Sequence, residues 1–182
     1  MIYRILHYGE EPLRAMSKPV ENIDNDIKRL VDDMFETMYA AKGVGLAAPQ
    51  IGKNIRLVVI DCGDDPIAMI NPRIIKKSGK ETGPEGCLSF PGLSENVQRA
   101  TKVTAEYTDP NDGELYEVQA EGLLARAIQH ELDHLDGVVF IDRMSQARRL
   151  QIKYELELIK QGETLYDEED DEDYEDSPIE AE

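Results

Sequence analysis

The sequence predicts an α+β protein in which antiparallel or mixed β-sheets pack around a central helix. Helical periodicity appears in three stretches, at about 25–42, 121–137 and 145–160, while short apolar runs separated by turn residues fill the middle of the chain. The sequence has no internal repeat, and helices combined with a meandering sheet in one domain define the α+β class.

Length and charge predict one globular domain with an acidic extension. The chain has 182 residues, of which 41% are hydrophobic, enough to bury a single core. The net charge is −18, but residues 163–182 hold 12 acidic and no basic residues, so residues 1–162 carry only −6. We therefore expect one folded domain at 1–162 and a disordered, solubilising tail at 163–182.

The chain shows no sign of export or of membrane attachment. The N-terminal residues lack the apolar core of a secretion signal, and no apolar run approaches the roughly 18 residues of a membrane span. We expect a cytoplasmic protein, and its acidic balance argues against stable binding to nucleic acid or anionic membranes. The two cysteines, Cys62 and Cys87, are too few for a disulfide framework and should be reduced and available as ligands.

The first helix is expected to follow a cap at Asp24 or Asn25 and to end near Gly43. Its apolar residues recur at helical spacing: Ile27, Leu30, Val31, Met34, Phe35 and Met38. The next segment, 43–52, is too rich in Gly, Ala and Pro for a good helix or a central strand. We expect an ordered loop or an extended edge there.

The middle of the chain favours short strands joined as hairpins. Residues 57–60 and 67–70 are typical of short buried strands. Residues 102–107 should pair with 115–118 across the turn residues at 109–113. This pattern predicts an antiparallel sheet.

Two further helices complete the expected fold. At 121–137 the apolar residues fall on one side of a helix, and Gly137 is a natural C-terminal stop. A last helix should run from about Ser145 to Lys160 and carries basic residues, namely Arg148, Arg149 and Lys153. The acidic tail begins soon after it.

The segment HELDH at 130–134 is the strongest chemical signal in the chain. His130 and His134 stand four residues apart, so both imidazoles can face one metal ion from the same side of a helix. Glu131 lies on that side and can reach a metal-bound water without binding the metal. The three residues overlap the apolar face of the helix, so the site should be partly dry, where a carboxylate can act as a base near neutral pH.

The third metal ligand decides the class of enzyme, and the residues alone leave it open. The long metzincin pattern fails because Phe140 stands where its third histidine would be. Glu155 or Glu157 from the following helix could complete a two-histidine, one-glutamate site, as in other zinc endopeptidases. Cys87 is the other candidate, because Gly86 removes a side chain beside the thiol and Pro91-Gly92 should force a turn soon afterwards.

Three separated segments together resemble the signature motifs of the peptide deformylases. They are GVGLAAPQ at 43–50, EGCLS at 85–89 and QHELDH at 129–134, and the resemblance extends over about residues 1–160. The bacterial type with a C-terminal helix is the closer match. The resemblance implies a hydrolase that removes the N-formyl group, as formate, from the N-terminal formylmethionine of newly synthesised polypeptides, with 1–162 as its catalytic domain.

The resemblance also implies a role for each motif residue. Cys87, His130 and His134 would hold one divalent metal, natively Fe(II) with Zn(II) or Ni(II) as substitutes. A metal-bound water would attack the formyl carbon, with Glu131 as general base and then general acid. Gln50, through its side-chain amide, and Leu88, through its backbone N–H, would stabilise the oxyanion.

Substrate contacts and partners are implied less directly. The backbone of Gly45 matches the position that pairs with the substrate peptide, and a methionine pocket is expected at Val44, Ile128 and the stem of Glu85. Some bacterial members place an arginine shortly after the cysteine motif, whereas this chain has Gly-Leu-Ser-Glu at 92–95. The basic C-terminal helix implies a transient contact with the ribosome. Nascent formylated peptides are the expected substrates.

Overall fold

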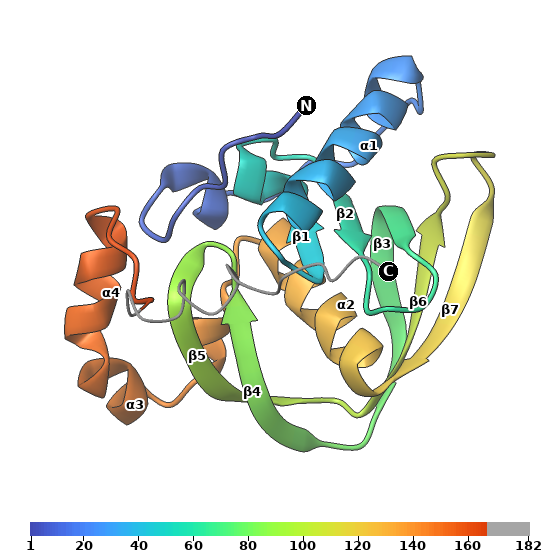
Figure 1. The fold of residues 1–182 in the computed structure, drawn as a ribbon. Coiled ribbons are helices and arrows are strands. Elements are labelled where there is room, and N and C mark those ends of the chain that lie inside the picture. The colour runs from blue at the N-terminus through green and yellow to red at the C-terminus, as the bar shows by residue number, and fades with distance from the viewer. Residues whose placement is uncertain (167–182) are drawn as a thin grey trace, which may run out of the picture.

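The computed structural model describes residues 1–166 and confirms the α+β class, with every pairing between its named strands antiparallel. A five-stranded sheet has the order β1-β2-β3-β6-β7, and β4 and β5 form a separate hairpin (Figure 1). Helix α2 lies between these two sheets (Figure 1). The strands are β1 (Gly45–Ala47), β2 (Leu57–Ile60), β3 (Ile67–Ser78), β4 (Glu81–Cys87), β5 (Phe90–Arg99), β6 (Lys102–Thr108) and β7 (Leu115–Glu121). The α-helices are α1 (Asn25–Ala40), α2 (Gly122–Leu135), α3 (Gln146–Gln151) and α4 (Lys153–Lys160).

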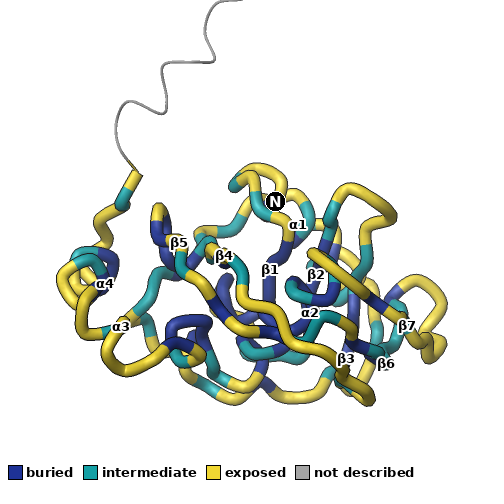
Figure 2. Tube along the Cα trace, turned by 90° about the horizontal axis from the view of Figure 1, so that it is seen from below, coloured by how far each residue is buried: buried dark blue, intermediate teal, exposed yellow. Residues whose placement is uncertain are grey.

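Strand β2 of the large sheet is buried on both faces, because its residues point alternately to opposite sides and each side packs against a helix. Val58 and Ile60 of β2 pack with α2 in one core cluster, while Leu57 and Val59 pack with α1 in another. This explains why residues 57–60 have no polar alternation. In Figure 2 the buried trace follows β1, β2 and α2, which places α2 and its motif in the interior.

Helix α1 and the segment after it follow the expected pattern with two adjustments. The Asp24 side chain caps α1 by accepting from the backbone N–H groups of Asp26 and Ile27. The helix ends at Ala40, three residues before Gly43. The Gly-, Ala- and Pro-rich segment that follows forms the edge strand β1 and then the 3₁₀ helix Ala48–Ile51, so it is ordered and extended at its start.

The β4–β5 hairpin was not predicted from the sequence. Gly83, Pro84 and Gly86 are poor strand formers, so residues 81–87 give no strand signal. Pro84 is tolerated because this sheet has only two strands and therefore two free edges. The prediction of a turn at Pro91-Gly92 was wrong. Cys87 pairs with Phe90, and Pro91 and Gly92 belong to β5.

The C-terminal helix is interrupted. Ile152 breaks the expected helix at 145–160 into α3 and α4. Its buried side chain joins Leu156 and Ile159 in a cluster against β5. The three residues stand at i, i+4 and i+7, the spacing of one helix face, so all of them can face the same cluster.

Residues 163–166, which the sequence analysis assigned to the tail, are described by the structure and lie against β5. The Leu165 backbone N–H donates to the Pro91 carbonyl at 3.0 Å, and the Leu165 side chain is partly buried. The remainder of the expected tail, 167–182, lies outside the described residues.

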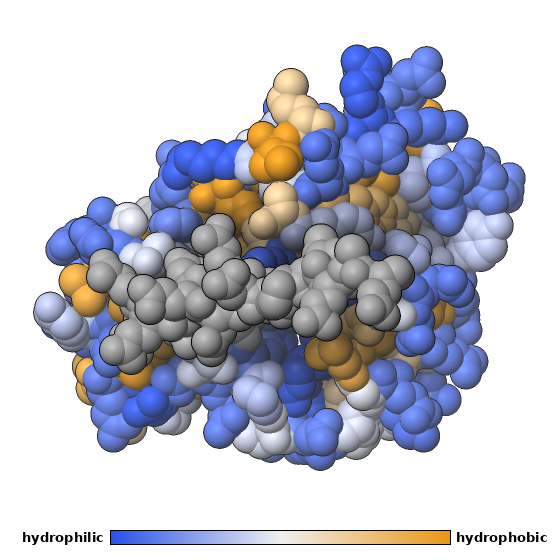
Figure 3. All heavy atoms as spheres, viewed as in Figure 1, coloured by the Kyte–Doolittle hydropathy of each residue, from blue (hydrophilic) through white to orange (hydrophobic). Residues whose placement is uncertain are grey.

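The face in Figure 3 is largely hydrophilic, with hydrophobic residues gathered near the N-terminus. Within residues 1–166, no helix is long and apolar enough to cross a membrane.

Candidate metal centre and active site

Helix α2 presents the HELDH segment to the interior of the protein. Its start follows the last residue of β7 directly, and its length is packed against the large sheet. His130 and His134 are buried, with ring centroids 5.1 Å apart, as the four-residue spacing predicts. Both imidazoles therefore face one region away from bulk water.

Cys87 reaches the two histidines from the end of β4. Its Sγ lies 3.4 Å from His134 Nε2, and one ligand atom each from Cys87, His130 and His134 lie within 4.8 Å of one another. Among residues 1–166 this is the one cluster of three or more such groups that could hold a metal. Glu155 and Glu157, the alternative third ligands, are on α4 and outside the cluster.

The cluster fits a transition-metal ion. Two imidazole nitrogens and one thiol sulfur form a set that suits Zn(II), Fe(II) and Ni(II). The Nδ1 atom of His130 lies 2.8 Å from Glu85 Oε1, which orients the ring and leaves Nε2 available to bind a metal. Burial lowers the pKa of His134 well below its ordinary value, so this imidazole is in the neutral form that binds a metal.

Glu85 contacts His130 with a carboxylate that is itself held by two arginines. Its carboxylate accepts hydrogen bonds from Arg99 at 2.8 and 2.9 Å and from Arg126 at 2.8 Å. Burial alone would raise the pKa of Glu85, but the hydrogen bonds from Arg99 and His130 outweigh burial and hold that pKa at about 2. Glu85 is therefore ionised throughout the neutral range.

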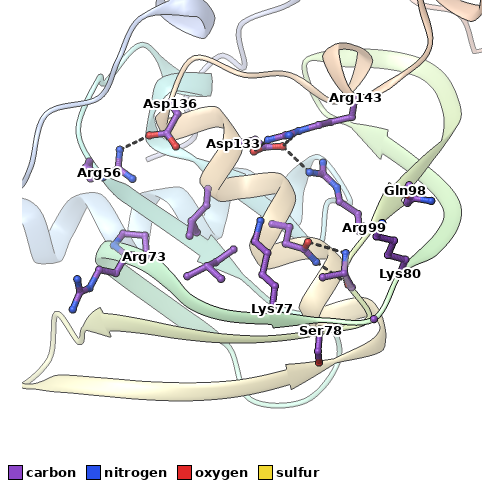
Figure 4. Close-up of a pocket in the computed structure, with 16 residues that line it drawn as sticks. Arg56, Arg73, Lys77, Ser78, Lys80, Gln98, Arg99, Asp133, Asp136 and Arg143 are labelled. Carbon is purple, nitrogen blue, oxygen red and sulfur yellow. Dashed lines mark hydrogen bonds and ion pairs between the residues drawn. The ribbon is translucent and has the colours of Figure 1, made fainter.

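Arg99 connects the centre to the opposite side of α2. It donates to Asp133 at 2.6 Å, and Asp133 also pairs with Arg143 (Figure 4). These residues line a hollow of about 740 Å³ that also holds Lys77 and Lys80 (Figure 4). This hollow is lined by none of the residues of the Cys87-His130-His134 cluster, so it is separate from that cluster.

Glu131 is the buried acid beside the three ligands. Its Oε1 lies against the α-carbon of Gly45, where any side chain would overlap it, and its Oε2 is buried without a hydrogen-bond partner. Burial raises the pKa of Glu131 to about 7. A carboxylate with that pKa can take up and release a proton at neutral pH.

Gln50 projects into the site from the 3₁₀ helix that follows β1. Its Oε1 accepts from the Ala47 backbone N–H at 2.9 Å, which fixes the amide orientation. Its Nε2 then donates to Ser89 Oγ at 3.1 Å and points toward Cys87 Sγ at 3.6 Å. Gln50 therefore presents an amide donor beside the ligands.

A cavity of about 400 Å³ opens onto the centre and brings together most of the residues expected from the sequence. The lining includes Val44, Gly45, Gln50, Cys87, Leu88, His130 and Glu131. A smaller cavity of about 110 Å³ adjoins it and shares Val44, Gly86, His130 and Glu131. Leu123, Arg126 and Ala127 of α2, together with Pro84 and Glu85, complete the lining of the smaller cavity.

The residues that line the smaller cavity differ from the methionine pocket expected from the sequence. Ile128 is fully buried in the core between α2 and the large sheet and lines neither cavity. Ala127 and Leu123 line it instead, because they lie three and seven residues before His130 and so share its helix face. That spacing was available in the sequence and would have identified both residues.

Comparisons with known proteins agree with this geometry. The sequence pattern of the family described as polypeptide deformylase matches residues 2–150. A peptide deformylase of Alkalilimnicola ehrlichii is 47% identical over 166 residues, covering 88% of this chain and 93% of the relative. A peptide deformylase of Chromobacterium violaceum is 49% identical over 158 residues, covering 85% of this chain and 94% of the relative.

Solved structures give the same result. The crystal structure of a peptide deformylase from Legionella pneumophila superimposes with a TM-score of 0.83 at 44% identity, covering 88% of this chain and 96% of that one. A peptide deformylase from Synechococcus elongatus, solved in complex with actinonin, gives 0.79 at 41% identity, covering 90% and 87%. The resemblance in the three motifs is thus confirmed, and this chain belongs to the peptide deformylase family of metal-dependent hydrolases.

Proposed function

We propose that this chain hydrolyses the formamide bond of N-terminal formylmethionine in newly synthesised polypeptides, in the cytoplasm, and releases formate. The observation that carries the proposal is Glu131: a buried carboxylate with a pKa of about 7 and one unpartnered oxygen, placed beside a Cys-His-His cluster. Membership of the family supports the same reaction.

Cys87, His130 and His134 would hold one divalent metal, and we propose Fe(II) as the native ion with Zn(II) or Ni(II) as substitutes. When bound, the metal supplies Lewis acidity, which polarises the formyl carbonyl and lowers the pKa of a water molecule. The Glu85 contact to His130 keeps that imidazole in place as a ligand.

Glu131 moves the proton. It takes a proton from the attacking water as the new C–O bond forms at the formyl carbon. It then gives the proton to the departing amine nitrogen as the C–N bond breaks, so that formate and a free N-terminal amine result. The position against Gly45 holds the carboxylate close to the site of attack.

Gln50 and Leu88 stabilise the negative charge that develops on the formyl oxygen. The Gln50 amide is held by Ala47 with its Nε2 beside Cys87 Sγ, where an oxyanion would accept a hydrogen bond from it. The backbone N–H of Leu88 would supply the second donor, and Leu88 lines the same cavity. A donor of this kind contributes about 3 kcal/mol to transition-state stabilisation.

The two cavities separate the first substrate residue from the rest of the peptide. The smaller one, about 110 Å³, is lined by the apolar residues Val44, Leu123 and Ala127, with Arg126 also in its wall, and would take the methionine side chain. The peptide backbone would pair with Gly45, because β1 is at the edge of its sheet and can accept another strand. Ile128 has no part in this pocket.

A contact with the ribosome would use α3 and α4. Arg148 already pairs with Glu95 at 2.7 Å, so such a contact would depend mainly on Arg149 and Lys153. We propose that the contact is transient, because exposed charges of this number bind weakly at physiological salt.

The experiment that tests the proposed function is product analysis on formyl-Met-Ala-Ser with metal-loaded full-length protein. We expect formate and a peptide lighter by one CO unit, with both peptide bonds intact. A zinc endopeptidase would instead yield peptide fragments. Glu131→Gln is the control and should abolish formate release while keeping the metal; absence of formate with the wild type would refute the proposal.

A further inference from the structure

Residues 163–166 bring an aromatic side chain to the catalytic cavity from outside the part of the chain that matches the family pattern. That match ends at residue 150. Tyr166 nevertheless lines the 400 Å³ cavity together with Gln50, Cys87 and Glu131. Its side chain is 64% exposed, so one face of the residue is open to a ligand.

Three contacts fix the backbone that leads to Tyr166. The chain turns at the end of α4, where the Glu163 backbone N–H donates to the Leu158 carbonyl at 3.0 Å. The Leu165 N–H then donates to the Pro91 carbonyl at 3.0 Å. The Leu165 side chain packs in the cluster that contains Phe90 and Leu93. In Figure 2 the described trace accordingly ends beside β5.

Gly92 allows the backbone of residues 165–166 to lie close to β5. Its φ is +81°, a left-handed conformation that favours glycine. A Cβ at this residue would lie 2.5 Å from the carbonyl carbon of Leu165 and 2.7 Å from the backbone nitrogen of Tyr166. The backbone of 165–166 therefore occupies the space where another residue would carry its side chain, and β5 is shaped to receive it.

The place of Tyr166 within the site determines which part of the substrate it meets. Tyr166 and residues 92–94 line the larger cavity but not the smaller one, where methionine is proposed to bind. His130 and Glu131 line both cavities, so the reacting bond lies where the two meet. The peptide residues that follow methionine must then leave through the larger cavity.

We propose that Tyr166 is a positioning residue for the substrate peptide beyond its first residue. The tyrosine offers an apolar ring and a polar hydroxyl at the cavity wall, a combination that binds peptide backbone and small side chains with little loss of entropy. Nothing in the three motifs encodes this contact. It rests on the proposed deformylase function and specifies which part of the substrate the C-terminal segment recognises.

The test compares formyl peptides of different length on full-length Tyr166→Ala and Tyr166→Phe. We expect Tyr166→Ala to raise KM for formyl-Met-Ala-Ser-Ala-Ala roughly three- to tenfold, the range typical of one aromatic contact, with a much smaller rise for formyl-Met amide. The value of kcat should change less than KM. Tyr166→Phe keeps the ring and should restore most of the affinity for the longer peptide.

Tyr154→Ala is the matched control, since Tyr154 is an exposed tyrosine on α4 outside both cavities. It should leave KM for both peptides unchanged. Equal KM ratios for long and short peptides in wild type and Tyr166→Ala would overturn the proposal. Failure of the wild type to release formate from either peptide would instead refute the proposed function.

Discussion

The carboxylate of Glu131 lies next to Gly45, so that the buried acid of α2 packs against the edge strand β1. A residue with a Cβ at position 45 would overlap Oε1 and push Glu131 away from the ligand cluster. The absence of a side chain at Gly45 thus leaves room for the Glu131 carboxylate beside the Cys-His-His cluster.

Gly45→Ala should therefore reduce kcat by about 100-fold, because a displacement of about 1 Å at a reacting group has this effect. Metal content should stay at the wild-type level, since none of the three ligands touches residue 45 directly. Steady-state kinetics with metal analysis on the same sample provides the measurement. Unchanged kcat in Gly45→Ala would show that Glu131 is not positioned by this contact.

Glu131→Gln should stabilise the metal-free protein, but only at high pH. The folded-state pKa of Glu131, about 7, is above the ordinary value of 4.5, so the fold favours the protonated acid. The contribution of this preference to the free energy of unfolding is fully present below about pH 4.5 and is lost as pH rises through 7. We expect Glu131→Gln to gain about 3 kcal/mol over the wild type near pH 9 and almost nothing near pH 5.

Urea unfolding of both metal-free proteins at the two pH values measures this difference. A gain of equal size at both pH values would mean that the effect is one of packing and not of a buried charge.

Glu85→Gln should show the opposite pH dependence. The folded-state pKa of Glu85, about 2, is below the ordinary 4.5, so its stability is present above about pH 4.5 and is lost as pH falls toward 2. At neutral pH the substitution leaves Arg99 and Arg126 without their shared carboxylate, which should cost about 3–5 kcal/mol. The stability of the variant should fall less than that of the wild type on acidification.

Glu85→Gln should also weaken metal binding by about 10- to 100-fold, the usual effect of removing the partner of a ligating histidine. Competition with a chelator measures the affinity. Wild-type affinity in a variant that remains folded would show that the His130 orientation does not depend on Glu85.

The acidic run after Tyr166 should make the enzyme prefer basic peptides. Residues 167–182 hold 11 acidic residues and follow directly in the sequence after Tyr166, which lines the cavity. We expect kcat/KM at low salt to be higher for formyl-Met-Lys-Lys than for formyl-Met-Glu-Glu. The ratio should fall toward one when salt shortens the Debye length to about 3 Å.

A full-length variant with these carboxylates replaced by amides is the control for that prediction. It should treat the two peptides alike at every salt concentration. A wild-type ratio near one at low salt would mean that the acidic run does not influence substrate choice.

The sequence was sufficient for the central helix and for the convergence of its two histidines, because both depend on local spacing. His130 and His134 converge as their four-residue interval requires, and the β6–β7 hairpin follows from its turn residues. The third ligand was different: local pattern left Cys87 and two glutamates open, and the combination of three motifs was needed to favour Cys87.

The missing parts depend on contacts between distant segments. The strand β4 contains Gly83, Pro84 and Gly86, whose low strand propensity is overridden by pairing with β5. The location of Tyr166 depends on the contact between Leu165 and Pro91, which no local pattern encodes. Ile128 was misplaced because its neighbour Ala127, and not Ile128 itself, shares the helix face of His130.

Metal content and formate release, measured together on anaerobically purified protein, test the central claim most directly. The two free cysteines allow a matched comparison, because Cys62 is partly buried beside the core and outside the ligand cluster. We predict about one divalent metal per chain, and formate release proportional to it, in wild type and Cys62→Ser, with both lost in Cys87→Ser. Full activity in metal-free protein, or undiminished metal and activity in Cys87→Ser, would contradict a Cys87-His130-His134 metal centre.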